Sequence, residues 1–264
     1  MRRILCLIAL SVVGLPLAAQ DGIYFVPQDR IAVRVMRDVP SVDLAPGVHV
    51  RTVVGTTGSF SYADFDATSA TVPHHHTREQ VDVGITGVFE MVLGNHTEFL
   101  TPGAGVIIPP NVTHAIANKG SGSMTLIEFH TVPRPDLVPP RPTMTFPANP
   151  QPTELAGERK LMEQLDGAAS QAAGTAKTVL GETCTMIWRT LKQGAVPTDI
   201  HPAPTRAELF VYIVRGQAAF VSSGQEHRAG PGALVVIPAM QQGVRAHAIG
   251  TTDVALVEFT TERR

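Results

Sequence analysis

The strongest constraint on how this chain can fold is an internal duplication within its 264 residues. Segments of the first half recur in the same order in the second half, about 128 residues further along. The matching segments are 54–55 and 180–181, 77–87 and 205–216, 102–111 and 231–240, and 126–129 and 256–259. Two copies of about 100 residues each have the size of ordinary domains, so we predict two fused domains rather than a solenoid of short repeats.

The segments within each copy are typical of β-strands. They are short, rich in Val, Ile, Thr and aromatic residues, and separated by glycine or proline. The clearest ones span 49–55, 89–94, 105–110, 185–191, 209–214 and 233–238. The chain has 23 glycines and 21 prolines, counts that suit many tight turns between strands. We therefore expect an all-β protein built from two barrels or sandwiches.

Residues 1–20 differ from the rest of the chain. They begin with two arginines after Met1, continue with an apolar run and end at small residues, a pattern typical of a secretory signal peptide. A membrane anchor is the alternative, but the apolar run is short and is interrupted by Gly14 and Pro16. We expect an exported protein, periplasmic or secreted, that has no membrane contact once this segment is removed.

Composition also separates the two copies. We place the first domain at 21–132 and the second at 167–264. The segment 133–166 between them is proline-rich, which favours an extended strap rather than a sheet interior. Its last part, 153–166, is expected to form a short helix with Thr153 as its N-cap.

Charge and cysteine content exclude several kinds of partner and cofactor. The net charge is −2 and charged residues make up 17% of the chain, without a basic stripe or an acidic tail, so nucleic acid is not an expected partner. Cys184 is the one cysteine outside the predicted signal peptide, which excludes an intramolecular disulfide and a thiolate cluster. Any bound metal would need imidazole, carboxylate or amide ligands.

Three consecutive histidines starting at His74 are the clearest chemical signal. Alternate residues of a strand share a face, so His74 and His76 would face the same side, together with Gln80 and Asp82 at even offsets. His114, which follows a Pro-Pro-Asn turn, offers a third imidazole. A solvent-facing polar run is the alternative for the histidines on their own.

These residues resemble the two motifs of the cupin superfamily, G-x5-H-x-H-x3/4-E-x6-G and G-x5-P-x-G-x2-H-x3-N. His74, His76 and Gly87 match the first motif, and Gln80 stands at its glutamate position. The second motif is matched by Gly103, Pro109, His114 and Asn118, with Asn111 in place of the turn glycine. The resemblance implies two tandem jelly-roll barrels, that is, a bicupin.

The order H-x-H-x2-E-Q resembles a variant of the small cupins in which the glutamine amide oxygen is a ligand. The resemblance implies that His74, His76, Gln80 and His114 bind one divalent transition metal, which would be Fe, Mn, Ni, Cu or Zn. Glu79 would point away, unless a β-bulge exchanges its role with that of Gln80. Three imidazoles and a neutral amide leave the charge of the ion uncompensated, which favours a small anionic or metal-chelating substrate.

Candidates for proton transfer are fewer. Asp82 is the candidate catalytic residue, and a solvent-facing charge at a strand edge is its alternative role. Tyr62 and Asp64 share one face of a preceding strand, and Arg51 could bind a carboxylate. Four other histidines of the first copy have no assigned function: His49, His75, His96 and His130. Of these, His75 and His96 are expected to face solvent.

The second copy lacks the motif residues. The stretch 202–204 replaces the histidine triplet and Gly243 stands at the position of His114, while Glu208 aligns with Gln80 and His247 with Asn118. We expect this barrel to be metal-free and structural. The alternative is a separate polar pocket lined by His201, Glu208 and His247.

Three functions are compatible with this pattern. The favoured one is a metal-dependent oxidoreductase of dioxygenase type, by analogy with bicupins. A non-redox metalloenzyme acting on sugar acids is the second, and a non-catalytic binding protein for a small ligand is the third. The two barrels are expected to pair within the chain, an arrangement that is also compatible with a homodimer.

Overall fold

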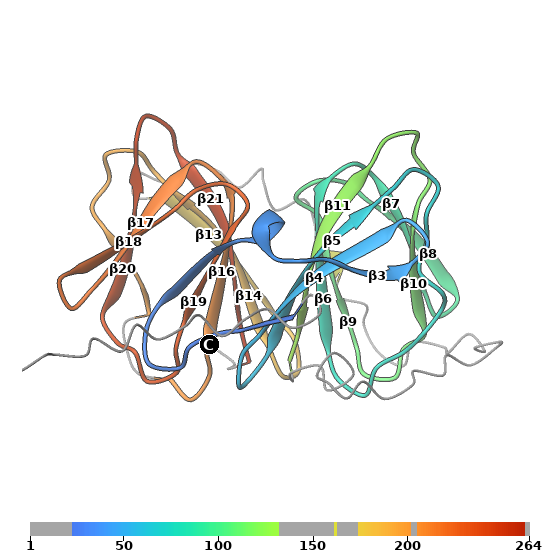
Figure 1. Cartoon of the computed structure of the whole chain (residues 1–264), viewed down its shortest axis with the longest axis horizontal. Helices are drawn as coiled ribbons and strands as arrows, with labels where there is room; N and C mark the ends of the chain where they lie inside the picture. The colour runs from blue at the N-terminus through green and yellow to red at the C-terminus, as the bar shows by residue number, and fades with distance from the viewer. Residues whose placement is uncertain (1–22, 132–160, 163–173, 202–204, 262–264) are drawn as a thin grey trace, which may run out of the picture.

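The computed structural model describes residues 23–131, 161–162, 174–201 and 205–261. Two β-barrels lie side by side, and each contains one large and one small sheet (Figure 1). The predicted all-β fold with two barrels is thereby confirmed. The predicted signal peptide and most of the proline-rich segment lie outside the described residues. Within the described ranges, no helix has the length and apolar character needed to cross a membrane.

The first barrel is built mainly from the first half of the chain. Its strands are β1 (Ile23–Phe25), β3 (Val42–Ala45), β4 (Val48–Val54), β5 (Ser59–Phe65), β6 (Gln80–Thr86), β7 (Phe89–Leu93), β8 (His96–Leu100), β9 (Gly105–Ile108), β10 (His114–Asn118), β11 (Met124–His130) and β12 (Leu161–Met162). The large sheet has the order β1-β4-β5-β11-β6-β9-β12, with β3 also paired to β4, and the small sheet has the order β10-β7-β8. An apolar core that includes Phe65, Phe89 and Leu126 fills the space between them.

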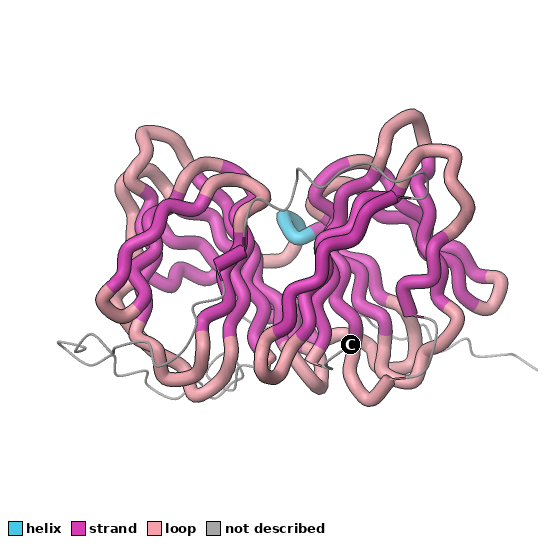
Figure 2. The backbone as a smooth tube through the Cα atoms, turned by 180° about the vertical axis from the view of Figure 1, so that it is seen from behind, coloured by secondary structure: helices cyan, strands magenta, loops and turns pink. Residues whose placement is uncertain are grey.

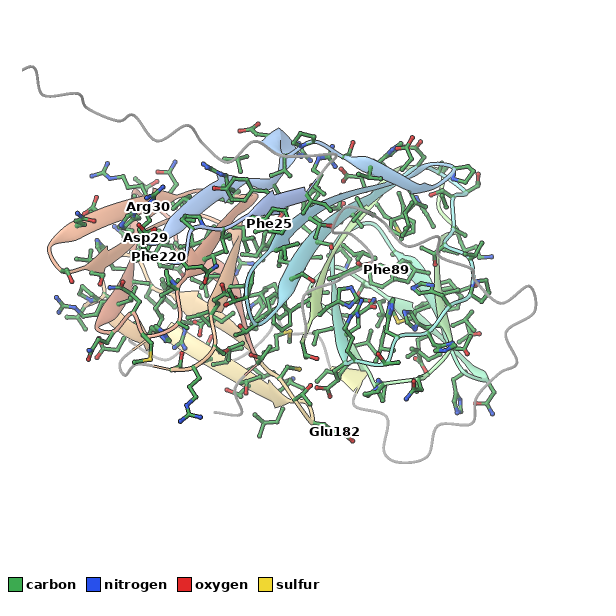
Figure 3. The ribbon with its side chains drawn as sticks, turned by 60° about the horizontal axis from the view of Figure 1, so that its bottom comes forward. Phe25, Asp29, Arg30, Phe89, Glu182 and Phe220 are labelled. Atoms are coloured by element: carbon green, nitrogen blue, oxygen red, sulfur yellow. The ribbon has the colours of Figure 1, made fainter. Side chains whose placement is uncertain are left out.

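The second barrel repeats this plan. Its strands are β2 (Ala32–Val35), β13 (Gly174–Leu180), β14 (Thr185–Leu191), β15 (Thr198–His201), β16 (Leu209–Arg215), β17 (Gln217–Ser222), β18 (Gln225–Ala229), β19 (Ala233–Ile237), β20 (Val244–Ile249) and β21 (Val254–Thr260). The sheets have the orders β13-β14-β21-β16-β19-β2 and β15-β20-β17-β18. Phe220 lies in its core as Phe89 lies in that of the first barrel (Figure 3).

Each barrel includes an edge strand that belongs, in sequence, to the segment preceding the other barrel. Strand β2 precedes most of the first barrel but pairs with β19 of the second, and β12 precedes the second barrel but pairs with β9 of the first. The short helix predicted for 153–166 is therefore wrong at Leu161–Met162, which form β12. Strand β9 has an open edge whose backbone N–H and C=O groups need hydrogen-bond partners. Strand β12 supplies these partners, whereas a weakly amphipathic helix would not. A 3-10 turn, η1 (Met36–Asp38), follows β2 and lies between the barrels (Figure 2).

The barrels share a continuous apolar interface. Phe60, Phe129, Phe210, Tyr212 and Phe259 are all buried there. The rings of Phe129 and Phe259 stack with centroids 5.2 Å apart, and those of Phe60 and Tyr212 are 5.6 Å apart. Strands at this interface are covered on both faces, which explains why every residue of β11 is buried. The predicted pairing within one chain is thereby confirmed.

Candidate metal centre

Three imidazoles converge at one end of the first barrel. The candidate ligand atoms of His74, His76 and His114 all lie within 4.8 Å of one another. Their ring centroids are 4.4 Å apart for His74 and His114, 4.9 Å for His74 and His76, and 5.3 Å for His76 and His114. Residues 40 positions apart in the chain are thus within reach of a single ion.

Backbone hydrogen bonds hold the three residues in place. The N–H groups of His74 and His114 donate to each other's carbonyl oxygens at 3.0 and 2.8 Å, and Asn111 N donates to His76 O at 2.6 Å. Asn111 has a φ of 64°, so the replacement of the turn glycine by asparagine keeps the left-handed conformation. Asn118 ties down the far end of β10, because its amide donates to the carbonyl oxygens of Asp66 and Gly122 at 3.0 and 2.7 Å.

The histidine tautomers suit a metal. Nδ1 of His74 lies 2.8 Å from Val72 O, and Nδ1 of His114 lies 2.9 Å from Val112 O. A carbonyl oxygen can only accept, so each Nδ1 carries the proton and each Nε2 carries the lone pair. Metal-ligating histidines typically have this arrangement, in which a backbone carbonyl fixes the ring.

Gln80 and Asp82 face the interior of the same barrel. Gln80 is 1% exposed and Asp82 is fully buried, and Gln80 Nε2 donates to Asp82 Oδ1 at 2.9 Å. This bond turns the amide so that Oε1, which is buried without a hydrogen-bond partner, remains available as a ligand. Burial raises the pKa of Asp82 well above its usual range, and the neighbouring carboxylate of Glu128 raises it further.

A second pair of polar residues, Glu128 and His130, lies beside these two on β11. Strand pairing sets Glu128 opposite Asp82 and His130 opposite Gln80. His130 is fully buried, its ring centroid is 5.1 Å from that of His76, and its Nε2 is 3.8 Å from Glu128 Oε2. Sequence reasoning left His130 without a role, although its even offset from Glu128 and Leu126 indicates the inward face. The four residues Gln80, Asp82, Glu128 and His130 are called the polar floor below.

Glu79 points out of the first barrel. Its carboxylate accepts hydrogen bonds from Glu182 N at 2.7 Å, from Thr183 N at 2.8 Å and from Thr183 Oγ1 at 2.7 Å. All three donors belong to the second barrel. The prediction that Glu79 points away is confirmed, and the alternative in which a bulge exchanges Glu79 with Gln80 is wrong.

The other residues of the first copy lie away from the triad. Arg51 binds the carboxylate of Asp64 at 2.8 Å on the outer face of the sheet, and the side chain of Tyr62 belongs to the interface between the barrels. None of these three side chains faces the barrel interior, because they alternate with the inward positions of β4 and β5. His75 and His96 are exposed, as predicted.

The second barrel keeps a metal-binding side chain at one of the four equivalent positions, that of His74, and differs at the other three. His201 pairs with Val244 as His74 pairs with His114, and Met240 N donates to Thr205 O as Asn111 N donates to His76 O. Leu209 pairs with Ile237 as Gln80 pairs with Ile108. The four candidate ligands thus correspond to His201, Thr205, Leu209 and Val244. Stretch 202–204 lies outside the described residues.

This register corrects three alignments made from sequence. Val244, not Gly243, stands at the position of His114, and His247 corresponds to Ala117 rather than to Asn118. Glu208 corresponds to Glu79 rather than to Gln80, because segment 205–216 is one residue longer than segment 77–87. Glu208 binds Thr56 and Thr57 of the first barrel, so the alternative of a pocket lined by His201, Glu208 and His247 is wrong. Among the described residues, no second group of three metal-binding side chains occurs.

The polar floor is also confined to the first barrel. Leu209 and Val211 occupy the positions of Gln80 and Asp82, and both belong to the apolar core. Glu258 corresponds to Glu128, but Arg189 binds it directly. The same fold therefore packs with apolar side chains at two of these positions and an ion pair at a third, which means that the polar floor and the triad are not requirements of the fold.

Comparison with known proteins agrees with this architecture. A family model described as a cupin domain matches residues 62–130, which include His74, His76, Gln80 and His114. No curated protein matches the sequence.

Solved structures with the same fold extend over both barrels. AerE from Microcystis aeruginosa has a TM-score of 0.63 and 13% identity, covering 84% of this chain and 96% of AerE. Oxalate decarboxylase from Bacillus subtilis has a TM-score of 0.66 and 14% identity, covering 88% and 77%. A protein named as glyoxylate-induced from Pseudomonas aeruginosa has a TM-score of 0.68 and 13% identity, covering 94% and 96%. The TM-scores show a shared fold, and at identities this low the similarity shows the fold alone.

Proposed function

We propose that the chain, whose residues 62–130 match a cupin domain, is a bicupin and that its first barrel binds one divalent transition metal through His74, His76, Gln80 and His114. The observation that carries this proposal is the convergence of three imidazoles within 4.8 Å. The tautomers of His74 and His114 and the buried, unpartnered Oε1 of Gln80 support it. Imidazole and amide ligands suit Fe, Mn, Ni, Cu or Zn.

The substrate we propose is a small, anionic, metal-chelating molecule. A bound divalent ion supplies Lewis acidity and, where it is redox-active, electron transfer. Burial raises the pKa of Asp82, which favours a proton on its Oδ2 inside the barrel. A protonated Asp82 adds no negative charge to the site, which favours binding of an anion.

The reaction we propose is a dioxygenase-like oxidation of a small organic acid, in which O₂ is the oxidant and is reduced as the acid is oxidised, with Asp82 holding the proton that is exchanged. Two of the structural neighbours bear the names of two-carbon acids, oxalate and glyoxylate, and the oxalate decarboxylase is described as having Mn(II) centres. We further propose that the protein is exported, on the basis of the signal-like segment 1–20.

Metal analysis of the protein purified from the exported fraction is the first test. The expected result is one equivalent of a transition metal in the wild type and loss of that equivalent in His114→Ala. The reconstituted protein is then assayed with small hydroxy and keto acids in an oxygen electrode. Turnover with Zn²⁺ under nitrogen would assign a non-redox enzyme instead, and stoichiometric binding without turnover would assign a binding protein.

A further inference from the structure

The two barrels are joined by a reciprocal pair of carboxylate contacts. Glu79 of the first barrel binds the turn 181–184 of the second through three hydrogen bonds. Glu208 of the second barrel binds the turn 55–58 of the first through three hydrogen bonds, from Thr56 N at 3.0 Å, Thr57 N at 2.9 Å and Thr57 Oγ1 at 3.1 Å. We call these contacts the Glu79 latch and the Glu208 latch. Figure 3 labels Glu182 in the turn that forms the first latch.

Both turns are shaped for this contact. Each is closed by the same backbone hydrogen bond, from Gly55 N to Gly58 O and from Gly181 N to Cys184 O, both at 2.9 Å. A Cβ on Gly181 would lie 2.5 Å from Glu79 Oε1, and a Cβ on Gly55 would collide with the carboxylate of Glu208 in the same way. Glycine at each turn therefore allows a buried carboxylate to reach two backbone N–H groups, a charge-assisted contact that is stronger than a neutral one.

The two latches differ in what lies next to them. Glu79 directly precedes Gln80, and the short segment 74–80 carries three of the four proposed ligands. That segment is fixed to the first barrel by the His74–His114 pair and by the bond from Asn111 N to His76 O. At its other end, Gln80 pairs with His130 and Ile108 within the first barrel, and the Glu79 latch adds a contact to the second barrel. The Glu208 latch precedes Leu209 and has no such set of ligands beside it.

We propose that Glu79 is a positioning residue for the metal site, so that the second barrel, although it lacks the ligands, holds part of the site in place. Glu79 is 2% exposed and its carboxylate is bound on both oxygens, which leaves little freedom for the backbone that carries Gln80. A ligand must be held within a few tenths of an ångström to bind well, and loss of an outer contact typically reduces metal affinity about 10- to 100-fold. This inference rests on the proposed metal site.

The chain provides its own control. Glu79→Gln and Glu208→Gln each remove a charged acceptor from equivalent contacts at the same interface, so both are expected to destabilise the pair of barrels to a similar extent. Only the first is expected to weaken metal binding. The measurement is the affinity for Zn²⁺ alone, by competition with a chromophoric chelator, on protein whose folding is checked by circular dichroism. We expect a loss of about 10-fold or more for Glu79→Gln and an unchanged affinity for Glu208→Gln.

A milder pair of variants covers the case in which Glu79→Gln does not fold. Thr183→Val removes one donor of the Glu79 latch from the second barrel, and Thr57→Val removes the equivalent donor of the Glu208 latch. Weaker Zn²⁺ binding in Thr183→Val but not in Thr57→Val supports the inference, because the altered residue lies outside the metal-binding barrel. Equal Zn²⁺ affinities in all variants and the wild type would overturn it. Absence of stoichiometric Zn²⁺ binding by the wild type would instead overturn the proposed metal site.

Discussion

Glu79 and Gln80 are adjacent in the chain but bind to different barrels. The amide of Gln80 donates to Asp82 inside the first barrel, whereas the carboxylate of Glu79 accepts from Thr183 in the second. Alternation along an extended segment sends the two side chains to opposite faces. The pair therefore connects the interior of one barrel to the backbone of the other at the point where the proposed ligands lie.

Removing an imidazole should abolish metal-dependent stabilisation. In the wild type, a ligand present at about 100 times its Kd should stabilise the fold by about 2.7 kcal/mol. In His114→Ala the triad is incomplete, so added Zn²⁺ should leave the melting temperature unchanged. Differential scanning calorimetry with and without Zn²⁺ measures both. An equal rise in the melting temperature of the variant would contradict the assignment of His114.

Replacing Gln80 by the residue found in the second barrel should weaken the site. Gln80→Leu introduces the side chain that Leu209 has in the equivalent position, so the barrel can pack around it. The variant loses one ligand oxygen, and we expect the Zn²⁺ affinity to fall by at least the roughly 10- to 100-fold that is typical for loss of a group that only orients a ligand. Gln80→Glu is the matched control, since it keeps a ligand oxygen. If chelator competition gave equal affinities for Gln80→Leu and the wild type, Gln80 would not be a ligand.

Asp82 should make the metal-free protein less stable as the pH rises. Its pKa is raised well above the ordinary value of 3.8 by burial and by Glu128. Between that value and the raised pKa, the folded protein holds a proton that the unfolded chain has released, so the free energy of unfolding falls with increasing pH. Asp82→Asn cannot ionise and removes this contribution.

Urea unfolding of the metal-free proteins from pH 4 to pH 8 tests this expectation. Asp82→Asn should be more stable than the wild type at pH 8, and the difference should shrink toward pH 4. The amide oxygen of the variant side chain can still accept the hydrogen bond from Gln80, which makes Asp82→Asn a close match in shape. Parallel pH profiles for the two proteins would exclude a raised pKa for Asp82.

His49 should titrate above its ordinary value of 6.5. The hydrogen bond to Asp43, 2.6 Å from His49 Nδ1, raises the pKa of His49, and Asp66 adds to the effect. The stabilisation is present below pH 6.5 and is lost as the pH rises through the raised pKa; for such an exposed pair it amounts to about 0.2–1 kcal/mol. Asp43→Asn should lower the pKa of His49, as measured by the NMR chemical shift of its ring proton. An unchanged titration in the variant would show that Asp43 has no part in it.

The interface between the barrels should contribute strongly to stability. Phe129 is fully buried and stacks on Phe259 across the interface, so Phe129→Ala should cost about 3–5 kcal/mol of unfolding free energy. Phe99 is 63% exposed, and Phe99→Ala should change stability by less than about 0.5 kcal/mol. Urea denaturation of both variants measures the difference. Similar losses in the two would argue against a tightly packed interface.

The local residue pattern was sufficient to predict much of the fold and several of the proposed ligands of this protein. The duplication, the short β-branched segments and their glycine and proline boundaries were sufficient to predict two barrels, because the residue pattern that marks a strand and its turns is local. The same alternation predicted that His74, His76, Gln80 and Asp82 share a face. It also predicted that Glu79 points away, and the hydrogen bonds of Glu79 confirm this.

Tertiary structure decided what local pattern does not encode. The pairing of β2 and β12 with the opposite barrels depends on which open sheet edges meet in space, not on the sequence of either strand. Likewise, Glu208 corresponds to Glu79 rather than to Gln80 because strand register, not residue counting, sets which side chains are equivalent. His130 joins the site for the same reason: β11 lies beside β6 in the sheet, although the two strands are far apart in the chain.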